Sequence, residues 1–524
     1  DVVIVRLTTY PGRIEAAQGY IEEIVGQQTD DDMKTEIVIR KHGFETSFSA
    51  AALEEAASIE ATPDVLSRRD LRDRFVFTID PEDARDFDDA ISVDFLNGQM
   101  RLGVHIADVS AYIAWGSALD LDARRRATSV YLPDRVIPML PLRISDELCS
   151  LRPDEDKLAF SVDMLLNSDG SVAECEFYPS LIRSSARLTY EEAQCILEGE
   201  DAYSSATQRD EPILHNRLLA LSRLAKKLVR RRLQRGAIEF EGVEAKVIVD
   251  AQGKPLEVKL HTKTDATSLI EEAMILANEQ VAAHLLACEA PMIYRCHEEP
   301  FAAALEELMP TLREFGYAQQ QAPQDSREIQ AILEASMGTP EHYLVSSLLL
   351  RAMKRARYTP LCATHFGLAS LAYTHFTSPI RRYPDLMVHR LLKAQLMGEP
   401  SAADMLKQLS WIAEHSSQQE REAEQASREA TALKLCEYLA PRVGERFAGI
   451  ITLVNSSGLV VREETTSAEG FVSRETLAED FEYESERYRY HDAETGCVYR
   501  LGQPVCVILD AVDLSSARLR FTFT

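Results

Sequence analysis

An alternation of apolar and polar positions surrounds one acidic loop. Residues 75–80, FVFTID, have the pattern of a strand, and Pro81 breaks it. A second strand-like run, AISVDF, covers residues 90–95. The residues Asp80, Asp86, Asp88 and Asp89 fall within ten positions of one another at this point. The pattern therefore predicts a loop between two strands that carries these carboxylates.

The first part of the chain has the pattern of short strands. Apolar runs over residues 2–7, 20–25 and 36–40 are separated by turn residues. We expect residues 1–50 to form part of a small β-barrel. Residues 51–74 are rich in Ala and Glu, which predicts a helical linker.

The pattern after the linker mixes strands and helices without an obvious break, so we expect one large α/β unit over residues 75–440. The segment 147–164 is expected to be strand, and helices are predicted over residues 189–197, 216–235, 268–284 and 410–439. Beyond residue 440, five short β segments with Gly turns predict a small barrel of the OB type over residues 441–524. The expected fold class is multidomain α/β.

Composition places the chain among ordinary globular proteins. Of its 524 residues, 45% are hydrophobic and 27% charged, and no apolar run approaches the length of a membrane span. Nine cysteines without a C-x-x-C pair favour reduced thiols in a cytoplasmic protein and argue against a structural zinc site. The chain starts at Asp1 instead of Met, so we expect a fragment or a processed form.

The chain is acidic as a whole but contains one strongly basic segment. The chain has 57 basic and 84 acidic residues, and this balance argues against nonspecific binding of nucleic acid. Within a predicted helix, however, residues 223–235 contain seven cations: Arg223, Lys226, Lys227, Arg230, Arg231, Arg232 and Arg235. This helix face either lies in solvent or contacts phosphates.

The four aspartates point to a metal site. Carboxylates a few ångströms apart repel each other, so they have raised pKa values or bind a cation, and ligation by oxygen alone favours Mg²⁺ or Mn²⁺. An EF-hand requires Gly at its sixth position and Glu at its twelfth, where a loop starting at Asp80 has Arg85 and Ile91. The remaining alternative is an acidic surface turn.

A second candidate site lies in the segment 365–392. Thr377, Ser378 and Pro379 are typical of the start of a helix, which would place Arg381 and Arg382 in its first turn. Cations there oppose the helix dipole, so an anion held by the helix terminus and an Arg fork would justify them. The alternative is a pair of structural ion bridges to nearby acids.

These motifs resemble the ribonuclease II and ribonuclease R family of 3′-to-5′ exoribonucleases. The resemblance rests on the aspartate loop and on the segments HIADVS, IPMLPLRISDELCSLRPDEDKL, LIEEAMILAN and THFTSPIRRYPDLMVHR, which occur in the family's order. RGAIEF and SPIRRYPD are closer to the ribonuclease R branch. The C-terminal segment is similar to an S1 RNA-binding domain, and residues 1–50 resemble the end of a cold-shock barrel.

The resemblance implies an RNB-type catalytic domain that hydrolyses single-stranded RNA processively to nucleoside 5′-monophosphates. It implies that the four aspartates hold Mg²⁺, with Mn²⁺ as the alternative, and that Asp88 is the most critical for activating water. It further implies that Arg381 holds the scissile phosphate, that Tyr131 and Phe240 clamp bases, and that Tyr190 contacts the substrate. We expect a monomeric cytoplasmic protein without membrane contact.

Other functions stay open at this point. The beginning of the cold-shock region and a Lys-rich tail have no counterpart in this sequence, so activity on structured RNA is left undecided. An RNA-binding scaffold with an inactive nuclease core, an endonuclease and a phosphatase are the competing functions. In the S1-like segment, the candidate RNA contacts are Phe447, Phe471, Tyr488, His491, Arg462, Arg474 and Arg487.

Overall fold

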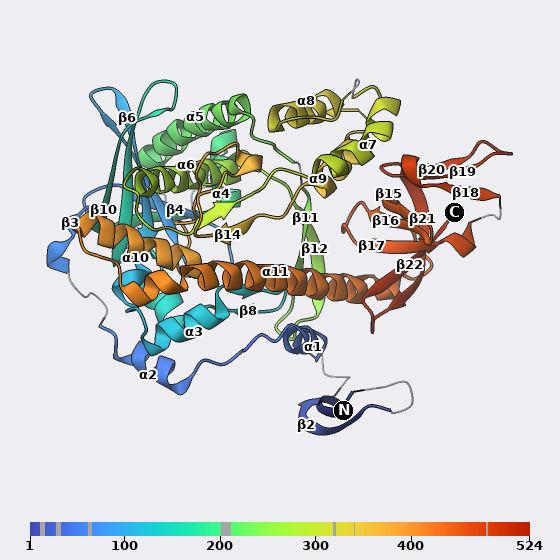
Figure 1. Cartoon of the computed structure of the whole chain (residues 1–524), viewed down its shortest axis with the longest axis horizontal. Coiled ribbons are helices and arrows are strands. Elements are labelled where there is room, and N and C mark those ends of the chain that lie inside the picture. The colour runs from blue at the N-terminus through green and yellow to red at the C-terminus, as the bar shows by residue number, and fades with distance from the viewer. Residues whose placement is uncertain are drawn as a thin grey trace.

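The structure is a computed structural model that describes residues 1–10, 16–27, 33–60, 65–200, 211–240, 242–317, 321–339, 341–477 and 480–524. Figure 1 shows a large mixed α/β part on one side and a β-barrel at the C-terminal end. The long helix α11 (Ala403–Leu439) runs between them, and the N-terminal hairpin lies below it in this view. The expected multidomain α/β fold is confirmed.

The core of the α/β part is a six-stranded sheet in the order β3-β10-β4-β5-β6-β9. Because β9 also pairs with β10, five of the strands close into a ring. All five residues of β4 are buried, which suits a strand covered on both faces. The strands are β3 (Arg69–Asp70), β4 (Val76–Asp80), β5 (Asp89–Leu96), β6 (Gln99–Ala107), β9 (Asp156–Leu166) and β10 (Val172–Thr189).

The helices expected over residues 189–197, 216–235, 268–284 and 410–439 are all present. Thr189 and Glu192 form a capping box that starts the helix directly after β10. Among the described residues that follow the N-terminal region, the α-helices other than α11 are α2 (Ala50–Ser58), α3 (Ala118–Arg126), α4 (Tyr190–Glu198), α5 (Glu211–Arg235), α6 (Asp265–Ala287), α7 (Ala302–Glu314), α8 (Ser326–Ser336), α9 (His342–Ala352) and α10 (Tyr383–Met397). None of the described helices is long and apolar enough to cross a membrane.

Three two-stranded antiparallel sheets complete the described residues of the α/β part: β7 (Val130–Tyr131) with β8 (Val136–Ile137), β11 (Glu244–Val249) with β12 (Pro255–His261), and β13 (Tyr294–Cys296) with β14 (Arg357–Thr359). The prediction of strand over residues 147–164 is wrong at its start, because Arg143–Cys149 forms a π-helix and β9 begins only at residue 156. Ile144, Leu148 and Cys149 are buried, so helical packing covers the apolar side chains that suggested a strand.

The N-terminal region has two strands instead of three. They are β1 (Val2–Thr9) and β2 (Gln18–Gly26), which pair antiparallel. The predicted strand over residues 36–40 is wrong, because Met33–Lys41 forms helix α1. Val38 and Ile39 of α1 pack into a hydrophobic cluster with Ala426 and Ala430 of α11, whose small side chains allow close approach.

The C-terminal region forms the predicted barrel and three additional strands. The closed barrel contains β15 (Arg446–Asn455), β16 (Gly458–Glu463), β17 (Glu469–Ser473), β22 (Arg518–Phe523) and β21 (Pro504–Asp513). A small sheet contains β18 (Phe481–Glu484), β19 (Arg489–Asp492) and β20 (Val498–Arg500). Barrel residues such as Ile451 and Phe521 share one hydrophobic cluster with Leu344 and Leu348 of α9 and Leu439 of α11. The barrel and the α/β part are therefore joined by a common core.

Candidate active site

The aspartate loop starts at the end of the buried strand β4. Asp80 is the last residue of β4, pairs in register with Thr189 of β10, and is only 8% exposed. Its Oδ2 atom is buried and has no hydrogen-bond partner among the described residues. A buried carboxylate oxygen without a partner is costly, so this atom is a candidate ligand for a cation.

Neighbouring segments hold the loop in place. Arg187 of β10 donates hydrogen bonds of 2.9 Å to the carbonyl oxygens of Pro81 and Glu82. The hydroxyl of Ser150 donates to the carbonyl oxygen of Arg85 and accepts from the backbone N–H of Phe87. The loop backbone is therefore fixed on both sides before any ligand binds.

Asp88 faces the second candidate segment. Its carboxylate is 4% exposed and accepts a 2.9 Å hydrogen bond at Oδ1 from the backbone N–H of Ile380. The Oδ2 atom lies 3.5 Å from Nε of Arg381 and has no hydrogen-bond partner among the described residues. The fold thus brings two predicted site residues together.

The other predicted residues surround this pair. Tyr131 of β7 donates a 3.2 Å hydrogen bond from its hydroxyl to Oδ2 of Asp86. Tyr190 is the first residue of α4, directly after Thr189, and the negative charges of Asp89 and Asp80 act on its hydroxyl. The pKa of the Tyr190 hydroxyl is raised mainly by burial and further by these two charges.

The carboxylates perturb one another. Burial, together with the charges of Asp89 and Asp86, raises the pKa of Asp80 to about 8. Burial raises the pKa of Asp89 to about 6 and that of Asp88 well above its usual value, although the Arg381 charge opposes both shifts. The cluster is therefore short of positive charge, which Arg381 alone does not supply.

The two arginines of the second segment have different environments. The prediction that both lie in the first turn of a helix is wrong, because α10 begins at Tyr383 and Arg382 is its N-cap. Arg382 forms a 2.7 Å ion pair with the fully buried Asp385. Arg381 is 44% exposed and faces the carboxylates. Arg382 therefore fits the alternative of a structural ion bridge, whereas Arg381 stays free to contact an anion.

The donor set fits a hard divalent cation. In the part of the chain that the structure describes, no three His, Cys, Asp or Glu side chains converge closely enough to hold a metal ion. The four aspartates nevertheless offer only oxygen donors, and Asp80 and Asp88 each present a buried oxygen without a hydrogen-bond partner. Because bare carboxylates repel, we expect them to converge only when a cation neutralises them.

Phe240 lies in a different cavity. It is half-buried beyond the end of α5 and lines a cavity of about 680 Å³ together with Lys226, Lys263 and Met337. Lys263 forms ion pairs with Glu239 and with Glu271. The structure thus brings together Tyr131, Tyr190 and the carboxylates, whereas Phe240 lines a separate cavity.

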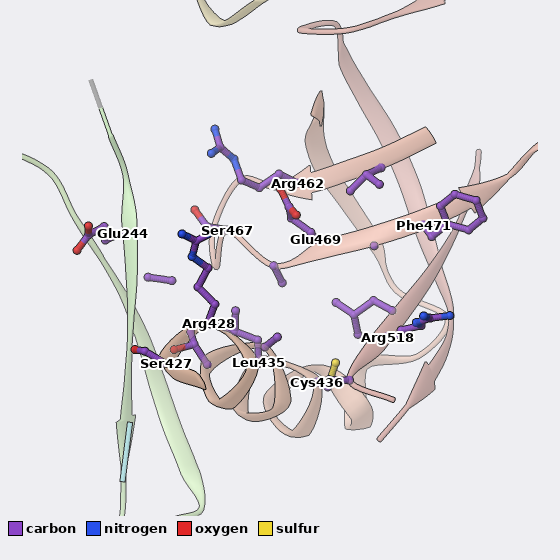
Figure 2. A pocket seen from close by; sticks show the side chains of 18 of the residues that line it. Glu244, Ser427, Arg428, Leu435, Cys436, Arg462, Ser467, Glu469, Phe471 and Arg518 are labelled. Carbon is purple, nitrogen blue, oxygen red and sulfur yellow. The ribbon is translucent and has the colours of Figure 1, made fainter. Parts of the chain in front are cut away.

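The S1-like barrel contributes a groove of about 1000 Å³ where it meets α11 and β11. Figure 2 shows Arg462, Phe471 and Arg518 on the barrel side and Arg428 on the side of α11. Phe447 was expected to stack on RNA but is 5% exposed in the barrel core, so this prediction is wrong. Arg474 donates to the carbonyl oxygen of Phe481.

Sequence reasoning did not find the network behind the site. Asp108, which follows β6, is fully buried and forms ion pairs with Arg68 at 2.8 Å and Lys393 at 2.5 Å. The Lys393 charge and that of Arg68 hold the pKa of Asp108 well below its usual value despite burial. The only sequence signal was the HIADVS segment, which reveals no partner because Arg68 and Lys393 are distant in the chain.

Family models match three parts of the chain. Residues 68–398 match the RNB domain, residues 1–49 the cold shock domain, and residues 440–523 the S1 RNA binding domain. Among curated proteins, ribonuclease R of Aquifex aeolicus is 41% identical over 99% of this chain and 74% of its own length. Ribonuclease R of Escherichia coli is 35% identical over 99% of this chain and 66% of its own length.

Solved structures agree with these matches. Mycoplasma genitalium RNase R in complex with ribose methylated single-stranded RNA has a TM-score of 0.89 at 27% identity, covering 97% of this chain and 80% of that one. Yeast Ssd1, described as a pseudonuclease, has a TM-score of 0.74 at 22% identity over 97% of this chain and 62% of that one. The likeness to Ssd1 shows the fold alone, so the fold does not by itself decide whether the carboxylates are active.

Proposed function

This chain belongs to the ribonuclease R family of RNB-domain 3′-to-5′ exoribonucleases, and from that premise we propose that it degrades single-stranded RNA processively to nucleoside 5′-monophosphates with Mg²⁺. One observation carries the proposal: Asp80 and Asp88, which are 8% and 4% exposed, each keep a buried oxygen without a hydrogen-bond partner, and that of Asp88 lies beside the exposed Arg381. An inactive scaffold would have no need for this arrangement.

In the proposed mechanism, Asp80, Asp86, Asp88 and Asp89 hold Mg²⁺, with Mn²⁺ as the alternative. When bound there, Mg²⁺ would supply charge neutralisation at the phosphoryl oxygens, activation of the attacking water and stabilisation of the leaving oxyanion. Asp88 is the carboxylate most important for the attack. Its orientation is set by the Ile380 backbone N–H, and its position beside Arg381 places it next to the phosphate.

Arg381 binds the scissile phosphate through a bidentate contact. Its Nη2 atom donates to the hydroxyl of Ser378 at 3.1 Å, which limits the directions the guanidinium can take. Tyr131 lies at the carboxylates and stacks on a base near the cleaved bond, while Phe240 clamps a base farther away. Tyr190, at the start of α4 near Asp80 and Asp89, contacts the substrate as well.

We also propose the boundaries of the parts: a partial cold-shock-like barrel over residues 1–50, a linker over 51–74, the RNB-type domain over 75–440 and the S1-like domain over 441–524. All nine cysteines are described and unpaired, which supports a reducing, cytoplasmic environment. The active form is proposed to be a monomer.

The test is hydrolysis of a 5′-labelled single-stranded RNA with and without Mg²⁺. We expect the full-length RNA to be converted to a short 5′-labelled end product with few intermediates, and chromatography should detect unlabelled mononucleotides from the first time point. Internal fragments would indicate an endonuclease, release of phosphate alone would indicate a phosphatase, and binding without cleavage in Mg²⁺ or Mn²⁺ would indicate an inactive scaffold.

A further inference from the structure

The exposed face of α5 has a row of cations that the proposed mechanism does not use. Arg223, Lys227 and Arg230 are all exposed, and their spacing of four and three residues places them on one side of the helix. This row occurs in a chain whose net charge is −27. A local reversal of sign in so acidic a protein calls for a physical reason.

The charges of this row are not compensated by the rest of the described structure. Arg223 and Arg230 form no ion pair with any described residue, and the ammonium of Lys227 donates only to the carbonyl oxygen of Ser168. Their neighbours Lys226 and Arg231 pair with Asp265 and Asp169. Both of these ion pairs are exposed, so each contributes little to stability. A bound phosphate could therefore replace either carboxylate with a small loss of free energy.

An aromatic side chain lies at one end of the row. Phe95, near the tip of the β5–β6 hairpin, is 54% exposed and lines a cavity of about 330 Å³ with Arg223 and Lys227. Figure 1 shows α5 beside the outer end of β6. The Arg217 guanidinium lies over the Phe95 ring at 5.7 Å from its centroid. The exposed part of the Phe95 ring offers an apolar surface on which a base could stack.

We propose that Arg223, Lys227, Arg230 and Phe95 form a second RNA-binding surface, here called the α5 surface, outside the catalytic site. The cations would contact successive phosphates, and Phe95 would stack on an unpaired base or ribose. Phe95 is six residues from Asp89 along β5, about 20 Å at strand spacing, so one nucleotide cannot reach both places. The choice of RNA over an acidic protein rests on the proposed function and on the exposed aromatic.

The probe is a circular single-stranded RNA of about 30 nucleotides, which has no 3′ end to enter the catalytic site. Its affinity is measured at several salt concentrations for the wild type and for a triple variant, Arg223→Gln, Lys227→Gln and Arg230→Gln. Since each lost phosphate contact reduces the slope of log K against log salt by about 0.7 for a single strand, we expect a slope shallower by about 2. Phe95→Ala should weaken binding about fivefold or more.

The matched control removes three exposed cations elsewhere: Arg143→Gln, Arg355→Gln and Lys407→Gln. It has the same net charge as the triple variant and should keep the wild-type slope. Equal slopes for wild type and triple variant, or equal losses in both variants, would overturn the proposal. So would a loss of poly-L-glutamate binding as large as the loss of RNA binding, because that would indicate a surface for acidic proteins.

These experiments can refute the proposal of the α5 surface and the proposal of exoribonuclease activity independently of each other. Turnover of a saturating short linear RNA should be the same for the triple variant and the wild type, because the short strand occupies only the catalytic site. If the wild type does not hydrolyse linear RNA, the proposed activity is wrong, while the circular RNA still reports on the α5 surface.

Discussion

The backbone N–H of Ile380 donates a 2.9 Å hydrogen bond to Oδ1 of Asp88, across 292 residues of chain. This bond connects the aspartate loop to the segment that carries Arg381. It leaves Oδ2 of Asp88 without a hydrogen-bond partner, 3.5 Å from Nε of Arg381. One oxygen therefore positions the carboxylate, and the other remains available for a cation.

Asp88→Asn should abolish hydrolysis, a loss of more than about a thousandfold, and leave RNA affinity within a few-fold of wild type. The amide keeps the shape of the side chain but removes a charge that organises the metal site. Single-turnover cleavage and equilibrium binding in Mg²⁺ measure the two effects. The matched control is Glu82→Gln, an exposed acid in the same loop, which should keep its turnover. Near-normal turnover of Asp88→Asn would refute its assignment.

Arg381→Lys should reduce turnover by about a hundredfold with little change in thermal stability. Lysine keeps the charge but not the planar pair of donors that a bidentate phosphate contact needs. Arg382→Lys should instead lower the melting temperature and change turnover less, because Arg382 pairs with the buried Asp385 and its replacement destabilises the fold. Melting temperatures and turnover of both variants test this division; similar profiles for the two would contradict it.

Tyr131→Ala should change the length of the final product. Tyr131 donates a hydrogen bond to Asp86, so the loss of its ring alters how firmly a short 3′ segment of RNA is held.

Phe240→Ala should weaken binding of short oligonucleotides by about 1 to 3 kcal/mol per lost stacking contact. Gel analysis of the final products tests the Tyr131→Ala variant, and oligonucleotide affinities test the Phe240→Ala variant. If neither variant alters the products or the affinities, both rings serve packing only.

Acid should destabilise the protein through buried neutral histidines. Burial lowers the pKa of His105 and of His389 to about 4 each. An unfolded histidine has a pKa near 6.5, so between pH 6.5 and 4 the unfolded chain binds one more proton per histidine than the folded chain. The contribution of each histidine to the free energy of unfolding therefore falls with falling pH, by about 1.4 kcal/mol per pH unit in this window, while the raised pKa values of Asp80 and Asp89 act in the opposite direction.

The measurement is urea unfolding of wild type and His389→Gln at pH 7 and pH 5. The variant should be less stable than wild type at pH 7. Because it lacks one of these protonations, its free energy of unfolding should decrease between pH 7 and pH 5 by about 2 kcal/mol less than that of wild type. His261→Gln, at an exposed histidine, serves as the control and should keep the wild-type pH dependence. An unchanged pH dependence in His389→Gln would show that His389 is not buried in its neutral form.

The S1-like barrel should hold RNA without taking part in chemistry. Removal of the barrel is an unsuitable test, because residues such as Ile451 share a core with Leu344 and Leu439, which truncation would expose. Phe471→Ala with Arg462→Gln changes two side chains that line the groove and leaves the shared core intact, although Arg462 also packs over the ring of Tyr343. We expect weaker binding of long RNA and a shallower salt dependence, with turnover of saturating short RNA unchanged. Loss of the chemical rate at intact affinity would contradict this role.

Local patterns predicted the elements that depend on local chemistry. The helix expected over residues 189–197 and the strands flanking the aspartate loop depend on neighbouring residues, so the sequence indicated them correctly. The segment 36–40 was misassigned because its apolar residues fit a strand, whereas packing of Val38 and Ile39 against α11 selects a helix. Tertiary contact overrode the local preference there.

The candidate site was predictable in composition but not in arrangement. The four aspartates and Arg381 stand out as residue types, yet only the fold separates Arg381 from Arg382 and supplies the Ile380 N–H. A backbone donor leaves no trace in sequence, because every residue except proline has one. The ion pairs of Asp108 were hidden for a related reason: their partners are far apart in the chain.

Helix α11 has 37 residues, which corresponds to a rod of about 55 Å that packs on the α/β part at one end and on the barrel at the other. The distance between the barrel groove and the carboxylates is therefore set by the protein and not by the RNA. Such a fixed span defines a threshold length: oligonucleotides below it occupy one place only, and those above it occupy both. Affinity should then increase in a step as the RNA is lengthened, instead of rising evenly with each nucleotide.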